Sequence, residues 1–226
     1  MLIDAINGNI GLVEFLIYTL SSLIVIFLTL PIHEFAHALI SDKLGDRTAR
    51  YSGRLTLNPF AHIDYIGAAF ILIFGFGWAK PVPVNTRSFN NPKRDMAITA
   101  VAGPIANIIL AFVSLIVYFI LYSIYTVVNF IALPYIALVF FYIADINIAL
   151  AVFNLLPIPP LDGSRVLTAI LPNRIYYKIM QYERILIIVV FVLLYTGILS
   201  RPLSTLSNYI FNGMLTLLNT IFSLFI

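Results

Sequence analysis

The chain has 226 residues, of which 61% are hydrophobic and 10% are charged, with a mean hydropathy of +1.00 and a formal net charge of +3. Soluble domains carry roughly 25% charged residues, so this composition excludes an ordinary soluble protein and indicates an integral membrane protein. Its basic residues lie in loops beside apolar runs, and we therefore expect no nucleic-acid partner. The absence of cysteine excludes disulfides and thiolate ligands, which leaves His, Asp and Glu as the strong metal ligands.

A long apolar run near the N-terminus predicts the first membrane helix over residues 12–44. This run exceeds the roughly 20 residues that cross a bilayer core, and Pro31 within it predicts a kink. Residues 1–8 lack a basic segment and a small-residue cleavage site, so we expect no removable signal peptide.

Two histidines and a glutamate lie near the end of this predicted helix, in an almost wholly apolar run. Because His33 and His37 are four residues apart, a helix projects both from one face, as two ligands of one ion must be. Glu34 lies beside them, as in zinc hydrolases whose glutamate is the general base. The alternative is a hydrogen-bonded polar cluster that joins helices. The metal site is favoured because intramembrane ionisable groups are usually functional.

The next two segments differ in polarity. Residues 46–64 are broken by Gly, Asn and Pro and predict a surface loop or short strands, in which His62 is interpreted as structural, with Asn58 and Asp64 as local partners. Residues 66–79 are apolar but too short to span a membrane comfortably. Their basic flanks place both ends on the cytoplasmic side, which predicts a re-entrant segment whose backbone faces protein or a water-filled cavity.

The rest of the chain is again apolar, with Gly103 and Asn107 suited to close helix packing. We predict an all-α fold: a multi-pass transmembrane helix bundle with a re-entrant hairpin segment, forming a single domain over residues 1–226. The distribution of basic residues places the N-terminus outside. The further helical or apolar stretches are residues 96–125, 135–156, 185–199 and 203–226.

Asp162 follows the predicted cytoplasmic end of the third long helix, at the same depth as His33 and His37. Catalytic zinc typically has three protein ligands and one open position, so Asp162 is the candidate third ligand. The alternative is a turn former, because Pro-Pro-Leu-Asp-Gly also suits a turn. Asp145 and Asn147 could pair between helices or line a water path, and the sequence does not decide between these roles.

Four motifs in order resemble the site-2 protease family of intramembrane zinc metalloproteases, in its minimal type without PDZ or CBS domains. They are HEFAH at 33–37, GRLTLNP leading to HID at 53–64, GPIAN at 103–107 and NLLPIPPLDG at 154–163. The resemblance covers about residues 20–170.

This resemblance implies one Zn²⁺ per chain, held by His33, His37 and Asp162. It also implies that Glu34 activates a zinc-bound water as the nucleophile, and that Asn154 lies near the scissile carbonyl as an oxyanion donor. On sequence grounds alone, Asn154 is equally consistent with an amide that packs helices together. A re-entrant β-hairpin is expected around residues 75–77, whose glycines suit pairing with an unwound substrate strand.

The sequence hypothesis is therefore a zinc-dependent intramembrane endopeptidase. It would cut peptide bonds within or near the transmembrane segment of single-span proteins, in the lipid bilayer of a prokaryotic cell membrane, with its active site toward the cytoplasm. The alternative is a membrane transporter or channel that uses intramembrane polar residues such as Asn107 and Asp145, but no second half of the chain mirrors the first. A third hypothesis is an inactive metal-binding scaffold, although every residue that the chemistry needs is present.

Overall fold

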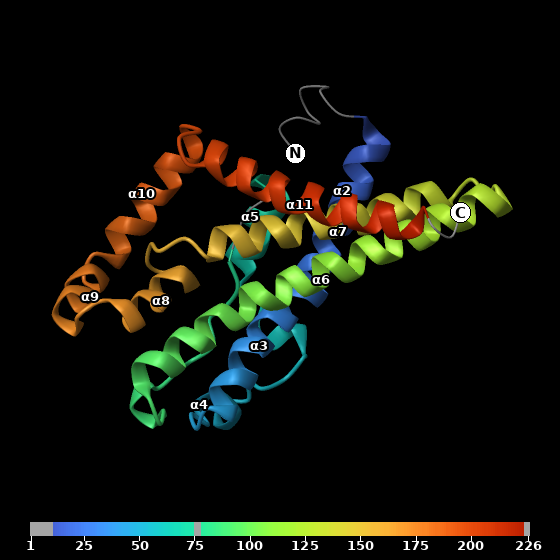
Figure 1. Ribbon diagram of the computed structural model, residues 1–226. Helices are drawn as coiled ribbons and strands as arrows, with labels where there is room; N and C mark the ends of the chain where they lie inside the picture. The colour runs from blue at the N-terminus through green and yellow to red at the C-terminus, as the bar shows by residue number, and fades with distance from the viewer. Residues whose placement is uncertain (1–10, 75–77, 224–226) are drawn as a thin grey trace.

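A computed structural model describes residues 11–74 and 78–223 of the chain. Over these residues every regular element is a helix, and the long helices lie side by side in a bundle (Figure 1). In the described part of the chain, three spans are long and apolar enough to cross a membrane: Leu12–Lys43, Pro92–Val128 and Leu133–Asn154. The bent pair Glu183–Tyr195 and Ser200–Phe222 makes a fourth when it is taken as one span. The prediction of an all-α, multi-pass membrane bundle is confirmed.

The first span contains an irregular turn. It consists of α2 (Leu12–Ile24), a π-helical turn at Val25–Thr29 and α3 (Leu30–Lys43). Pro31 accounts for this turn, because it has no N–H and its ring would clash with the carbonyl of Phe27 four residues earlier. The expected distortion thus lies immediately before the residues that carry the site.

The polar connection after α3 contains short helices and no strand among its described residues. These are α4 (Thr48–Tyr51) and a 3₁₀ turn at Pro59–Ala61, so the alternative of short strands was wrong. The fully buried Asp46 carboxylate ties this connection together. It accepts hydrogen bonds from the backbone N–H of Thr48 at 3.0 Å and from the N–H of Asn85, far along the chain, at 2.7 Å.

The short apolar segment that was predicted over residues 66–79 returns to where it begins. It starts as α5 (Tyr65–Phe74). Gly67 in this helix lies so close to the returning chain that an added Cβ would be 1.9 Å from the Trp78 carbonyl oxygen. The Lys80 N–H then donates to the His62 carbonyl at 2.8 Å. Both ends of the segment therefore lie together, as a re-entrant segment requires.

Two long antiparallel helices follow, α6 (Pro92–Val128) and α7 (Leu133–Asn154). The first begins four residues earlier than predicted, because the side chain of Asn91 caps it and Pro92 suits its first position. It ends at Asn129, whose φ of 57° is left-handed.

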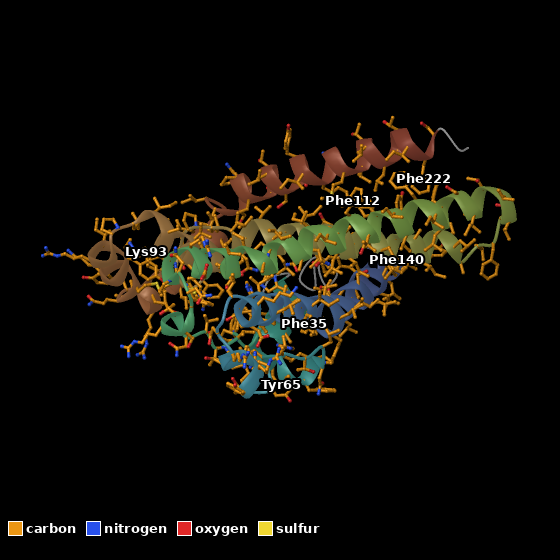
Figure 2. The ribbon with its side chains drawn as sticks, turned by 60° about the horizontal axis from the view of Figure 1, so that its bottom comes forward. Phe35, Tyr65, Lys93, Phe112, Phe140 and Phe222 are labelled. Atoms are coloured by element: carbon orange, nitrogen blue, oxygen red, sulfur yellow. The ribbon has the colours of Figure 1, made fainter. Side chains whose placement is uncertain are left out.

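Helix α7 lies between the two main hydrophobic clusters. One face of α7 packs against α2 and α5 around Ile143 and Ile146. Its other face packs against α6 and α11, where Ala144 and Ile148 are buried. Phe112 and Phe222 lie between α6 and α11 (Figure 2).

The C-terminal third contains two helices that the sequence did not reveal, α8 (Asp162–Ile170) and α9 (Asn173–Met180). The last two are α10 (Glu183–Tyr195) and α11 (Ser200–Phe222), bent by 76° relative to each other. Gly197 makes the bend accessible, because its φ of 78° favours glycine. Helix α10 leads away from the bundle and α11 crosses back over α6 and α7 (Figure 1).

Replacing Asp46 with asparagine should destabilise the connection between α3 and α6. Burial alone would raise the pKa of the Asp46 carboxyl, but hydrogen bonds from Thr48, Asn85 and Ser41 lower it below its ordinary value. Its stabilising contribution is therefore present above the ordinary carboxyl pKa and is lost as the pH falls through the lowered value. We expect Asp46→Asn to reduce the free energy of unfolding by about 2 kcal/mol at neutral pH, measured by denaturant titration in detergent.

Asp42→Asn is the matched control. Asp42 pairs with Arg50, whose side chain is 56% exposed, so its loss should lower the free energy of unfolding by less than the loss of Asp46 does. Equal effects of the two substitutions would contradict the role assigned to Asp46.

Candidate metal centre

Three potential metal ligands converge where α3 meets the start of α8. The Nε2 atoms of His33 and His37 are 3.1 Å apart. The Asp162 Oδ2 atom lies 3.1 Å from the Nε2 of His37 and 3.3 Å from that of His33. Among the described residues, this is the one group of at least three His, Cys, Asp or Glu side chains close enough to hold an ion. The structure thus brings all three predicted ligands together.

A backbone carbonyl determines how the His37 ring is oriented. His37 Nδ1 lies 2.7 Å from the carbonyl oxygen of Thr99 in α6, which can only accept a hydrogen bond. The proton of the neutral ring is therefore assigned to Nδ1, which leaves the Nε2 lone pair directed at His33 and Asp162. Such a contact between the outer nitrogen of a histidine and a carbonyl is typical of metal-ligating histidines.

Close approach of α6 to α3 depends on Gly103. A Cβ at this position would lie 2.4 Å from His37 Nε2 and 2.5 Å from His33 Cε1, so any larger residue would displace the two rings. The prediction that Gly103 serves close packing agrees with this geometry. Its packing partners are the candidate ligands themselves.

Asp162 is positioned by contact between α8 and the end of α7. It is the first residue of α8. At the neighbouring Gly163, a Cβ would be 2.2 Å from the Leu155 carbonyl oxygen, so this glycine allows the two helix ends to touch. Burial alone would raise the pKa of the Asp162 carboxyl, but His37 and His33 lower it well below its usual range. Ligation of a metal requires the ionised form of this carboxyl.

The donor set fits a zinc ion. Two neutral imidazoles and a carboxylate are typical zinc ligands, and tetrahedral coordination at usual bond lengths would place them about 3.4 Å apart. The observed separations of 3.1 to 3.3 Å are close to this value. Without a cation or an added proton, the Asp162 carboxylate would face the lone pair of His37 Nε2 inside a largely apolar bundle, which would be unfavourable.

Glu34 lies next to the ligands and is held by the chain that follows the re-entrant segment. Its side chain is 8% exposed, and its Oε2 atom accepts a hydrogen bond of 3.2 Å from the backbone N–H of Val82. The buried Arg54 side chain anchors the same stretch by donating to the Lys80 carbonyl. One carboxylate oxygen of Glu34 thus has a protein partner, and the other is available to a small molecule.

A cavity of about 260 Å³ opens beside these groups. The three candidate ligands and Glu34 line it together with Asn154, the last residue of α7. The remaining lining is mostly apolar, from residues such as Leu150, Phe153, Trp78, Val190 and Phe191. A molecule in this cavity would therefore meet a few converging polar groups within an apolar wall.

His62 does not belong to this centre. It is fully buried, and its Nε2 atom lies 2.8 Å from the carbonyl oxygen of Thr56. Its structural role agrees with the sequence interpretation, but the partners do not. Asn58 instead accepts from the N–H of Phe60, and Asp64 accepts from N–H groups at the start of α5.

Sequence reasoning missed Thr99 and Val82, because each acts through its backbone, which any residue type could supply. Two other sequence expectations concern Asn147 and residues 75–77. The Asn147 side chain donates to the Ile143 carbonyl of its own helix, not to Asp145. Residues 75–77, where a β-hairpin was expected, lie outside the described residues.

Comparisons with known proteins found a matching family and two similar proteins. The model for peptidase family M50 matches residues 123–197. "Putative zinc metalloprotease YwhC" of Bacillus subtilis is 39% identical over 214 residues, which cover 92% of this chain and 97% of the relative. "Putative zinc metalloprotease MJ0611" of Methanocaldococcus jannaschii is 34% identical over 139 residues, which cover 60% of this chain and 62% of that protein. No solved structure gives a significant match.

Replacing Gly103 with alanine should weaken metal binding without removing a ligand. The added methyl group would displace the two histidine rings, and we expect zinc affinity to fall about 10- to 100-fold, as when a group that orients a ligand is lost. The measurement is zinc titration against a competing chelator.

Gly213→Ala in α11 is the matched control, because a Cβ at Gly213 meets nothing within 4 Å. It should leave zinc affinity unchanged. Unaltered affinity in the Gly103→Ala protein would contradict the close-approach argument.

Proposed function

Because this chain belongs to peptidase family M50, the site-2 protease family, we propose that it is a zinc-dependent endopeptidase acting within the membrane. Its substrates would be single-span membrane proteins, cut within or near their transmembrane segments. All 226 residues would form one protease domain with one zinc ion. The observation that carries this proposal is the meeting of His33, His37, Asp162 and Glu34 in one cavity of a membrane bundle.

His33, His37 and Asp162 would hold the metal. When bound, zinc supplies a Lewis acid that polarises the scissile carbonyl and makes water easier to deprotonate. Glu34 would take a proton from the attacking water through the carboxylate oxygen that Val82 leaves free, and then deliver this proton to the departing amine. Its burial and its hydrogen bond to Val82 support this role, because both restrict the carboxylate to one orientation.

Asn154 is proposed to donate a hydrogen bond to the oxygen that becomes negative during attack. Its place in the lining of the same cavity supports this role. The apolar wall beside it would exclude bulk water, so this interaction would be stronger than in solvent.

The substrate would have to be unwound locally, because a helix hides its carbonyls in hydrogen bonds. We propose that cleavage occurs toward the cytoplasmic side of a prokaryotic cell membrane, as the basic loops around α8 and α9 indicate. Membership of a peptidase family disfavours the transporter alternative.

Zinc content tests the ligand set without knowledge of the substrate. Purified parent protein should contain about one zinc per chain. Asp162→Ala removes a direct ligand and should lower zinc affinity more than about 100-fold, since the loss of merely orienting groups costs up to that factor. Mass spectrometry of the metal content measures this. Asp42→Ala, which removes a carboxylate outside the cavity, is the control, and equal zinc content in all three proteins would overturn the assignment.

Glu34→Gln tests the proposed base. The substitution keeps the shape of the side chain but removes its ability to take a proton, so peptide cleavage should fall about a thousandfold while zinc remains bound. The assay uses a panel of single-span model proteins with helix-breaking residues near one membrane end, reconstituted with the enzyme and followed by mass spectrometry of the products. Glu14→Gln, the same change at an exposed position of α2, should retain activity. Full cleavage by the Glu34→Gln protein would refute the base assignment.

A further inference from the structure

One cation lines the catalytic cavity without an apparent partner. Arg165 lies in α8, three residues after Asp162, and its side chain contributes to the cavity wall. Its guanidinium makes no hydrogen bond or ion pair within residues 11–74 and 78–223. Among the described lining residues it is the one lysine or arginine. Arg165 is therefore the cation that this part of the wall offers to a substrate.

Three other arginines have partners for their side chains. Arg50 pairs with Asp42, Arg94 pairs with Asp95, and Arg54 donates to a backbone carbonyl. The guanidinium groups of these three arginines are therefore engaged within the protein. Arg165 differs from them because it is half-buried, has no partner among the described residues and belongs to the cavity lining.

We infer that Arg165 binds an acidic side chain of the substrate and makes the enzyme prefer peptides that carry Asp or Glu near the scissile bond. This inference rests on the proposed protease function and concerns its specificity. A carboxylate entering an apolar cavity loses its hydration at considerable cost, and a guanidinium offsets that cost with paired, charge-assisted hydrogen bonds. The apolar wall strengthens the attraction because it lowers the local dielectric.

The geometry limits where the acidic residue can lie. Three residues along a helix advance about 4.5 Å, so the Arg165 backbone lies one turn from that of Asp162. An extended substrate advances about 3.3 Å per residue, and the long arginine side chain adds reach. The acidic residue should therefore lie within about three positions of the bond that is cut.

The experiment starts from a single-span model protein that the enzyme cleaves, with its cut site mapped by mass spectrometry. Each of the three positions on either side is changed in turn to Glu, Gln or Lys, and kcat/KM is measured in neutral phosphatidylcholine vesicles. In the parent enzyme, Glu should exceed Gln by about tenfold at one or more positions. A ratio near one at every position would overturn the inference without any enzyme variant.

Variants at Arg165 assign the preference to this residue. Arg165→Gln should reduce the Glu-to-Gln ratio to about one, Arg165→Lys should retain part of it, and Arg165→Glu should favour Lys over Glu. Arg174→Gln, the same change at an exposed arginine of α9 that does not line the cavity, should keep the parent ratio. A parent-like ratio in Arg165→Gln would contradict the inference.

Two further comparisons distinguish recognition of the substrate carboxylate from catalysis and from lipid binding. Binding of the Glu and Gln peptides to the Glu34→Gln protein, followed by fluorescence anisotropy, measures the same preference without turnover. If the parent cleaves Gln peptides as well as Glu peptides, the protease function stands and the specificity inference fails. Cleavage that depends on anionic lipid but not on the substrate carboxylate would overturn the inference and show that Arg165 contacts the membrane instead.

Discussion

Four ionisable side chains meet inside an apolar helix bundle, and the cost of leaving any of them unpaired constrains the elements around them. Helix α6 must come close enough for the Thr99 carbonyl to reach His37, which only a glycine at position 103 allows. The returning chain after α5 must bring the Val82 N–H to Glu34. Helix α6 and the chain after α5 are thus positioned by polar contacts. Water could not replace these contacts, because the bilayer core contains none.

Helix ends, as well as helix surfaces, build the centre. Asp162 opens α8 and Asn154 closes α7, while the glycine after Asp162 lets the two ends touch. Polar side chains and unpaired backbone groups can coexist at such ends without interrupting a helix inside the membrane. The same arrangement places Arg165 one turn beyond Asp162, so a single short helix carries both a proposed metal ligand and the proposed specificity residue.

Part of this arrangement was predictable from sequence, and the missing parts have physical reasons. The long spans were predicted to within a few residues, because a bilayer imposes both length and apolar composition on a helix. Helices α8 and α9 were missed, because they are short amphipathic helices of nine and eight residues and lack the long apolar run that marks a membrane span. The partners of His62 were wrong because a backbone carbonyl, not a nearby polar side chain, accepts its contact.

The sequence by itself determined the membrane class of the protein and the chemistry of its centre. Apolar runs define spans, and the four-residue spacing of His33 and His37 on a helix defines a pair of candidate ligands. Tertiary structure alone decided which backbone groups complete that centre. Contacts of Thr99 and Val82 involve N–H and C=O groups that every residue type carries, so no side-chain pattern records them. The apolar cavity in which Arg165 is proposed to bind substrate likewise forms only when distant helices pack together.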